Sequence, residues 1–349
     1  MSATAQSGPG GVAPGGPAAS PAGAGRPAVW KALVAAQRRF PLLQLVLLVA
    51  AFVAGVVTLP GFGGPLSIVS VLVIASLAGL ASIGQTITIL VGGFDLSVAG
   101  FIVAGGLIVT QLAERLHIGF WGSLLILIPG SFVLGGLVGY LSHRFRIQPL
   151  ILTLAMGSLA LGLVRGPTGL SVVGSAPAWL TGLASPISTT FGLPVPPILV
   201  IWVVVIIVMA LFLRFTVAGR RVYLTGANPA AAEYSLVNTR LVWVLAFAFS
   251  AVCSSLTGVM LVSFSGNVDP NLGNPYLFIS LAAVIVGGTI GGGPGDYTRT
   301  VVGALLLTVV TTVLVGHGLT SADQQIMYGV VILVAMAIYG RERRIRDRV

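Results

Sequence analysis

The chain has 349 residues, of which 56% are hydrophobic and 7% are charged, and its mean hydropathy is +1.04. Average soluble chains carry about 25% charged residues, so this composition excludes a soluble globular domain and indicates a polytopic membrane protein. The net charge of +10 does not indicate nucleic-acid binding, because the arginines fall between and beside apolar runs instead of forming one basic face.

The residue types that build disulfides and metal sites are scarce. The single cysteine, Cys253, lies inside an apolar run, cannot form an internal disulfide, and is expected to pack as a small apolar residue. The three histidines, His117, His143 and His317, stand apart and show no zinc-ligand spacing. We therefore expect no metal and no cofactor on this chain.

The N-terminal segment differs in composition from the rest of the chain. Residues 1–27 are mostly Ala, Gly, Pro and Ser, with almost no large apolar side chain. Such a segment cannot bury enough apolar surface to fold, so we expect a disordered cytoplasmic tail over residues 1–37. It contains no hydrophobic core of a signal peptide. The apolar run 42–59 follows two arginines without an Ala-x-Ala cleavage site, and we interpret it as an uncleaved first span.

Apolar runs between glycines, prolines and charge clusters predict an all-α fold with about ten transmembrane helices. Several of these runs are short for a span. They cover residues 42–59, 66–91, 98–112, 120–141, 150–164, 198–213, 241–264, 276–290, 298–315 and 323–339. An even number of spans places both termini on one side of the membrane.

The basic residues indicate which side is cytoplasmic. With ten spans, one side receives 16 lysines and arginines, and the other receives only Arg115 and Arg165. The positive-inside rule therefore places both termini, the basic tail 341–349 and the loop 214–240 in the cytoplasm. The main external segment, 165–197, is rich in Pro, Gly, Ser and Thr and is expected to be a partly structured interfacial loop.

Two polar, glycine-rich segments interrupt apolar runs where a simple span should continue. The first is Gly-Gly-Phe-Asp-Leu-Ser at 92–97, and the second, 287–296, begins with Gly-Gly and ends with Gly-Pro-Gly-Asp. Non-helical backbone at membrane depth needs protein or water to satisfy it, so both segments are candidates for a pathway, a re-entrant turn or a hinge. The alternative is a tight cytoplasmic turn in which glycine supplies a positive φ and the aspartate caps the next helix. Asp95, which would cap a helix from Leu96 onward, is the sharper case because an acid near the membrane is costly and often functional.

The loop 214–240 is the longest basic polar interval between two apolar runs. Asn228 can cap a helix over 229–236, whose first residue is a proline and whose other residues include several good helix formers. Asn238 and Thr239 are available to cap the next long helix. This pattern predicts a helix of about two turns outside the lipid, which either docks a partner or merely joins two spans.

Three stretches share their motifs and their order with one protein family. Residues 84–98 end in Gly-Gly-Phe-Asp-Leu-Ser-Val and are similar to a Gly-Gly-Ile-Asp-Leu-Ser-Val-Gly core. Residues 226–233, Gly-Ala-Asn-Pro-Ala-Ala-Ala-Glu, are similar to a Gly-x-Asn-x-x-Ala-Ala loop, and residues 282–289 to an Ala-Ala-Val-x-x-Gly-Gly-Thr stretch. Over residues 41–339 the chain therefore resembles the ribose-type permease subunits of bacterial ABC importers, a branched-chain-like superfamily.

The resemblance implies a permease that pairs with a second copy or a paralogue and docks ATPase subunits on the cytoplasmic side. It would receive a sugar or similar small polar solute from an extracytoplasmic solute-binding protein. The implied ATPase-coupling residues, on a cytoplasmic coupling helix, are Gly226, Asn228, Pro229, Ala231, Ala232 and Glu233. A sugar that crosses the bilayer needs groups that can hydrogen-bond to its hydroxyls, and the densest cluster of polar residues at membrane depth would supply them. The predicted pathway or hinge residues are Gln85, Thr86, Gly92, Gly93, Asp95, Ser97, Gly287 and Gly288.

The chain departs from the family pattern at four positions. Ala99 replaces a frequent glycine after the Asp-Leu-Ser-Val core, and Leu236 stands where glycine is usual. Leu277 and Ile279 stand where acidic residues often precede the Ala-Ala-Val stretch. Without those acids, the solute and the gating contacts are expected to differ from the family pattern, while the overall role stays the same.

Other classes of membrane protein fit the sequence less well. A self-sufficient pump needs a Walker A lysine, and the only lysine, Lys31, lies outside such a motif, so ATP and magnesium are expected on the partner ATPase and this chain is not an enzyme. A secondary transporter or channel is the nearest alternative, although such proteins usually need several charges at membrane depth and only Asp95 qualifies.

A membrane protease is the alternative from a different class. Gly-Pro-Gly-Asp at 293–296 satisfies the Gly-x-Gly-Asp pattern of intramembrane aspartyl proteases, which need a second aspartate close by. Asp95 is the best second candidate. A four-residue match in a chain with 47 glycines is weak support.

The sequence thus predicts a multi-pass protein of the bacterial plasma (inner) membrane, with a transmembrane permease domain over residues 38–340. The disordered tail precedes this domain and the basic tail follows it. The expected partners are the lipid membrane, an ABC ATPase subunit, a solute-binding protein and a second permease, with no nucleic acid among them.

Overall fold

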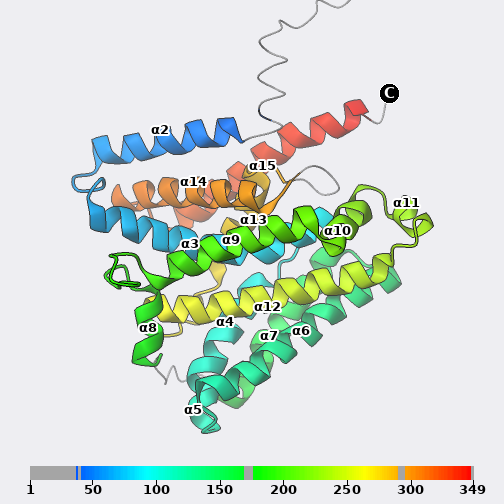
Figure 1. Ribbon diagram of the computed structural model, residues 1–349, viewed down its shortest axis with the longest axis horizontal. Coiled ribbons are helices and arrows are strands. Elements are labelled where there is room, and N and C mark those ends of the chain that lie inside the picture. Colours follow the sequence, from blue (N-terminus) through cyan, green and yellow to red (C-terminus); the bar gives the residue numbers. More distant parts are fainter. Residues whose placement is uncertain (1–36, 38–40, 169–175, 290–294, 347–349) are drawn as a thin grey trace, which may run out of the picture. The chain divides into compact units, whose positions relative to one another are not determined.

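The computed structural model describes residues 37, 41–168, 176–289 and 295–346. The chain divides into residues 1–40, where Gln37 alone is described, and residues 41–349, which carry all the labelled helices of Figure 1. The predicted disordered tail therefore lies outside the described residues apart from Gln37, as does the end of the predicted basic tail.

The described residues form helices and turns, and no strand occurs among them, so the all-α prediction is confirmed for this part of the chain. In chain order the helices are α2 (Leu42–Thr58), α3 (Pro65–Val91), α4 (Val98–Leu107), the π-helix η1 (Ile108–Leu112), α5 (Ala113–Arg115), α6 (Gly119–Phe145), α7 (Pro149–Thr168), α8 (Ala178–Ala184), α9 (Pro197–Phe215), α10 (Val217–Ala227), α11 (Pro229–Tyr234), α12 (Thr239–Ser265), α13 (Asn274–Val286), α14 (Tyr297–Gly316) and α15 (Ser321–Arg346).

Seven described segments are long and apolar enough to cross a membrane: α3, the continuous α4–η1–α5 segment, α6, α7, α9, α12 and α14. Helices α2 and α13 are apolar but shorter. Each of the ten apolar runs predicted from the sequence overlaps one of these helices or α15, and the count of ten spans stays a prediction. The run predicted to extend to residue 290 ends earlier, at Val286, because two glycines follow.

Helix α12 lies at the centre of the packing and contacts α3, α4 and α6. Of the most apolar 18 residues of α12, 61% are buried, whereas for α9 the share is 22%. Most of the apolar surface of α9 is therefore exposed on the outside of the protein, where lipid can cover it. A buried tyrosine ties three helices together: the Tyr297 hydroxyl donates to the Gly79 carbonyl (2.8 Å) and accepts from Trp202 Nε1 (3.1 Å). A buried phenol needs such partners, so α14, α3 and α9 are fixed in register here.

The predicted external segment is partly structured, as expected. It contains α8, where Trp179 stacks on Trp121 of α6 with ring centroids 6.3 Å apart. Residues 169–175 of this segment lie outside the described residues.

Candidate functional site

The first glycine turn, residues 92–97, stops α3 with a left-handed residue. Gly92 has φ 103°, a backbone conformation that glycine adopts without a steric penalty. The N–H of Gly92 donates to the Ile89 carbonyl (3.0 Å) and that of Gly93 to the Thr88 carbonyl (2.8 Å). A Cβ atom on Gly93 would lie 2.8 Å from the Phe247 ring of α12, so this turn is pressed against α12.

Asp95 is buried in this turn and uses only one of its carboxyl oxygens. Oδ1 accepts the backbone N–H of Ser97 (2.8 Å) and the Ser97 hydroxyl. This is an Asx turn that precedes α4, which begins at Val98, so the expectation that Asp95 caps a helix from Leu96 onward is wrong. Oδ2 and the hydroxyl of Ser250 on α12 interact with each other, but neither makes a hydrogen bond within 3.5 Å to any described residue.

Gln85 and Thr86 lie on α3, one to two turns before this stop, and both are fully buried. The Thr86 hydroxyl lies 3.0 Å from that of Thr300 on α14 and donates to the Ser82 carbonyl (2.8 Å). The Gln85 amide has no hydrogen-bond partner within the described chain. A buried amide without a partner costs about 1–3 kcal/mol, so the predicted pathway cluster contains polar groups that this arrangement does not satisfy.

The second glycine turn, 287–296, repeats the helix stop after α13. Gly288 has φ 86°, and the N–H of Thr289 donates to the Val284 carbonyl (3.1 Å). The carbonyl of Val286 accepts a hydrogen bond from Gln44 Nε2 of α2 (2.8 Å). A side chain from another helix thus satisfies backbone that α13 leaves open.

The Gly-x-Gly-Asp pattern of this turn is only partly visible. Residues 290–294 lie outside the described residues. Asp296 Oδ1 accepts the N–H of Arg299 (2.9 Å), which confirms the predicted N-cap of α14. A protease would need Asp296 as one of two catalytic aspartates, whereas here this carboxyl caps a helix.

The interval 214–240 contains two helices, whereas the sequence predicted one. The unpredicted helix, α10, begins after Thr216, whose hydroxyl accepts the Gly219 N–H (3.0 Å). Asn228 caps α11 as predicted, with Oδ1 accepting the Ala231 N–H (3.1 Å). In the same way Asn238 caps α12, whereas the other candidate cap, Thr239, is the first residue of that helix.

Helix α11 ends at Tyr234, two residues before the predicted end at Leu236. The reason is that Leu236 adopts a left-handed conformation, with φ 59°. In this conformation the N–H of Val237 reaches back to the Ala232 carbonyl (3.0 Å) and closes the helix end. Ala232 and Val237 are buried beneath the turn.

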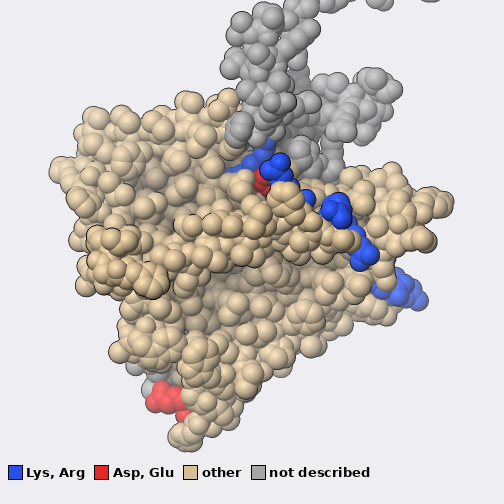
Figure 2. All heavy atoms as spheres, viewed as in Figure 1, with Lys and Arg blue, Asp and Glu red and all other residues tan. Residues whose placement is uncertain are grey.

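The tip of α11 exposes two large apolar side chains. Tyr234 is 91% exposed and Leu236 is 94% exposed. Holding a non-glycine residue such as Leu236 in the left-handed region costs about 1–2 kcal/mol of conformational free energy. In this conformation the apolar side chain of Leu236 points outward. Figure 1 shows α11 projecting beyond the end of α12, and Figure 2 shows basic side chains gathered at this end of the molecule.

Glu233, the predicted acidic coupling residue, is tied to the helices behind α11. Its Oε1 accepts the Thr239 hydroxyl (2.6 Å), and Thr239 Oγ1 lies 3.0 Å from Nε2 of His143 at the end of α6. Together with Arg240, these residues line a shallow pocket at the base of α11. From the sequence we considered His143 only as a zinc ligand and did not predict this contact. Its position in the last turn of an apolar run could have indicated a polar contact at the helix end.

Helix α10 contacts the end of α3 just before the first glycine turn, and it contacts the second glycine turn. A Cβ atom on Gly226 would lie 1.8 Å from the Leu90 carbonyl oxygen, so only glycine allows α10 to approach the end of α3 this closely. The Tyr223 hydroxyl donates to the Gly295 carbonyl (2.6 Å) beside Asp296. Burial, and then the nearby Asp296 carboxylate, raise the pKa of Tyr223 to about 12, so the phenol keeps the proton that it donates.

The structure also adds residues that sequence reasoning missed. Gln44 was not predicted because it is a lone polar residue in the apolar run 42–59. Tyr223 was not predicted because it is a single aromatic residue in a basic loop. Among the residues that the structure describes, no group of three or more His, Cys, Asp or Glu side chains could hold a metal ion.

Comparison with known proteins gives one consistent result. Residues 67–336 match the family described as branched-chain amino acid transport system / permease component. The chain is 30% identical to the ribose import permease protein RbsC of Haemophilus influenzae over 282 residues, covering 79% of this chain and 86% of that protein. The RbsC protein of Escherichia coli K12 is 28% identical over 77% of this chain and 84% of its own length. An autoinducer 2 import system permease protein, LsrD of Escherichia coli SMS-3-5, is 29% identical over 74% and 79%. No solved structure matches the chain.

Proposed function

The chain belongs to the family of branched-chain amino acid transport system / permease components, and we propose that it translocates a sugar or similar small polar solute as the permease subunit of an ABC importer. Relatives named as ribose and autoinducer 2 import permeases support this solute class. The buried hydroxyl and amide groups around Gln85 and Asp95 fit a polar cargo.

The proposed topology has ten spans in the bacterial plasma (inner) membrane, with both termini in the cytoplasm. The long helices supply seven spans, and α2, α13 and α15 supply the other three. The basic residues at the α10–α11 end support a cytoplasmic position for that end, because the other side receives only Arg115 and Arg165.

The observation that carries the proposal is the exposed tip of α11. In a membrane protein most exposed apolar side chains meet lipid, whereas Tyr234 and Leu236 lie among polar and basic residues of the interval 214–240. Exposed aromatic and aliphatic side chains on a capped, rigid element are typical anchors for a protein partner. We assign α11 as the coupling helix, with Gly226, Asn228, Pro229, Ala231, Ala232 and Glu233 as the coupling residues that shape it.

The partner at α11 is an ATPase subunit, which holds ATP and magnesium, while this chain carries no cofactor. The chain lacks a Walker A motif, so it depends on that subunit for energy. A solute-binding protein delivers the cargo on the opposite side, and a second permease, identical or paralogous, completes the membrane part.

Coupling needs a rigid connection from α11 to the pathway, and α10 provides one. Gly226 abuts the end of α3 just before Gly92, and Tyr223 bonds to Gly295 in the second turn. ATP-driven movement of the ATPase pair would therefore reach the turns that contain Asp95 and Gly288.

The test uses the chain solubilised from its native membrane, together with the ATPase that co-purifies with it. In proteoliposomes, Leu236→Gly removes an apolar anchor and relieves the left-handed strain. We expect it to lower solute-stimulated ATP hydrolysis severalfold while the melting temperature of the free chain stays level or rises. Glu233→Arg should lower the same activity and leave membrane insertion intact. Phe191→Gly is the matched control, because Phe191 is also an exposed apolar residue in the left-handed conformation and lies in the predicted external segment.

Two results would overturn the proposal. One is normal coupling in the Leu236→Gly and Glu233→Arg variants. The other is solute movement along an ion gradient by the pure chain, with no ATPase recovered in mild detergent, which would indicate a secondary transporter or channel.

A further inference from the structure

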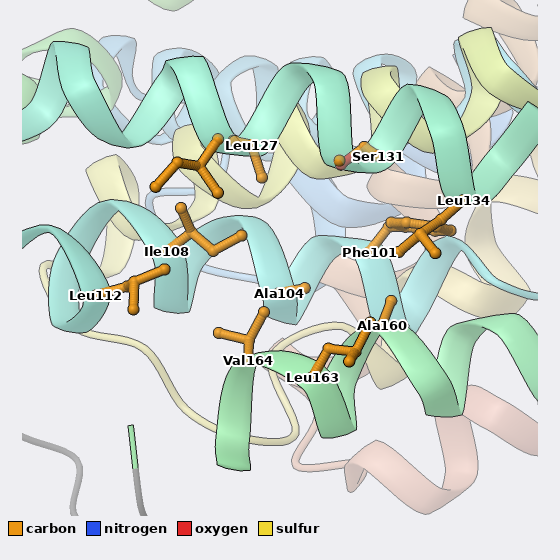
Figure 3. Close-up of a pocket in the computed structure, with 12 residues that line it drawn as sticks. Phe101, Ala104, Ile108, Leu112, Leu127, Ser131, Leu134, Ala160, Leu163 and Val164 are labelled. Carbon is orange, nitrogen blue, oxygen red and sulfur yellow. The ribbon is translucent and has the colours of Figure 1, made fainter. Parts of the chain in front are cut away.

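A pocket of about 200 Å³ opens between the α4–η1 segment, α6 and α7 (Figure 3). Its walls are apolar, and most of the side chains that point into it are buried. The buried apolar wall residues are Phe101, Ala104, Ile108, Leu127, Ala160 and Val164. Ile126 of α6 is 42% exposed and Leu163 of α7 is 54% exposed, so the pocket opens to the outside between these two helices.

Two local features of the sequence border this pocket. On the wall formed by α6, Gly130 has no side chain to fill the space, and it directly follows Pro129, which lacks a backbone N–H. On the facing wall the chain forms the π-helix η1, and π-helical turns often occur at functional sites.

The pocket presents no unsatisfied polar group to a ligand. The hydroxyl of Ser131, its only polar wall side chain, already pairs with that of Ser255 on α12 (2.6 Å). The surface around the opening is apolar as well. The exposed side chains there include Leu125, Ile128, Phe132 and Leu159. In a membrane-spanning chain, the molecules that reach such an opening are lipids.

The length of one wall fits an acyl chain. The wall from Phe101 to Leu112 covers 12 residues, and the 11 steps between its ends, at 1.5 Å each, give about 16 Å. The hydrocarbon core of a bilayer is about 30 Å thick, so one leaflet is about 15 Å deep. This wall is therefore about as long as one leaflet is deep.

Two arginines closely follow, in the sequence, the wall residues at one end of the pocket. Arg115 follows the wall residue Leu112 by three positions, and Arg165 directly follows Val164, with Glu114 also at this end. Arg165 Nη2 donates to the Pro270 carbonyl (3.3 Å), which leaves other guanidinium N–H groups for a ligand. Guanidinium groups are preferred partners of phosphate.

We infer that this pocket is a binding site for an anionic phospholipid, with one acyl chain between α4–η1, α6 and α7 and the phosphate beside Arg115 and Arg165. The bound chain occupies the space between η1 and Gly130. The site lies on the segment that directly follows Asp95, so the lipid packs against the helix that leaves the first glycine turn.

The test is photolabelling of the full chain in liposomes that contain phosphatidylglycerol with a diazirine in its acyl chain. Mass spectrometry of the peptides should place the label on 101–112 and 126–134 severalfold more often than on the exposed face of α9. Gly130→Leu should reduce pocket labelling to the α9 level, because Gly130 lines the pocket and a Cβ atom there meets no atom within 4 Å, so a leucine can narrow the pocket without a clash at Cβ. Gly162→Leu on α7, which is equally open, is the matched control and should leave the labelling unchanged.

The headgroup is tested with phosphatidylcholine that carries the same diazirine. We expect about fivefold less pocket labelling with this lipid, and Arg165→Gln should abolish the difference. Equal labelling of the pocket and the α9 face, equal labelling by the two lipids, or full labelling of Gly130→Leu would each overturn the inference. A crosslink that joins two copies of the chain through the pocket would overturn it as well, since it would show a protein occupant.

Discussion

Residues 92–97 and 287–296 both follow a helix that ends at a left-handed glycine, yet their aspartates have different surroundings. Asp296 is partly exposed and uses its carboxyl to cap α14, whereas Asp95 is buried with one oxygen unpaired. A serine could form either turn at lower desolvation cost. The carboxylate of Asp296 thus has a structural role as a helix cap. The carboxyl group of Asp95 is costly to bury, and the turn that contains it does not require a carboxylate.

Replacing Asp95 should have the largest effect. Asp95→Ala leaves the buried Ser97 N–H without an acceptor, which costs about 1–3 kcal/mol, and removes the carboxylate from the predicted pathway. We expect solute uptake to fall by about tenfold, equivalent to about 1.4 kcal/mol in the barrier. Asp95→Asn keeps the acceptor for Ser97, so it separates the two effects: uptake should fall while the melting temperature in detergent stays near that of the wild type. Wild-type uptake in Asp95→Asn would show that the carboxylate serves only the turn.

The shared feature of the two turns should give a smaller, equal effect. Gly92→Ala and Gly288→Ala each place a Cβ atom in the left-handed region, which costs about 1–2 kcal/mol. Thermal unfolding in detergent should show similar losses for both. Gly162→Ala, at an open helical position, is the control and should be neutral or stabilising. A neutral Gly92→Ala would mean that the turn can be rebuilt without its left-handed residue.

The smallest effect is expected at the other aspartate. Asp296→Ala removes the N-cap of α14 and should cost about 1 kcal/mol of stability, with uptake per folded molecule unchanged. Asp296→Ser keeps a capping oxygen and should recover most of the loss. If Asp296→Ser has the melting temperature of the wild type but does not transport, the carboxylate of Asp296 has a role in transport like that predicted for Asp95.

Local chemistry explains what the sequence could predict. The caps at Asn228, Asn238 and Asp296 and the left-handed glycines at 92 and 288 depend on residues within one turn of each other, and the structure has them all. The positions of the long helices followed from apolar length alone.

Features that depend on distant contacts could not be predicted in the same way. The sequence of α10 contains glycines and arginines and reads as a polar loop, and its helix packs on α3 through Gly226. The left-handed Leu236 breaks the usual preference for glycine, so the end of α11 was placed too late. The contacts of Gln44 and His143 join helices that are far apart in the chain, and no local pattern announces them.

The position of α10 between the two glycine turns limits how the protein can move. Helix α10 abuts the Leu90 carbonyl at Gly226 and bonds to the Gly295 carbonyl through Tyr223, so a shift of α10 would act on the end of α3 and on the second turn together. We therefore expect a change at either contact to weaken the response of both turns. In a double-mutant cycle, changes at Tyr223 and Gly226 would then be non-additive, although Tyr223 bonds to the second turn and Gly226 abuts the end of α3.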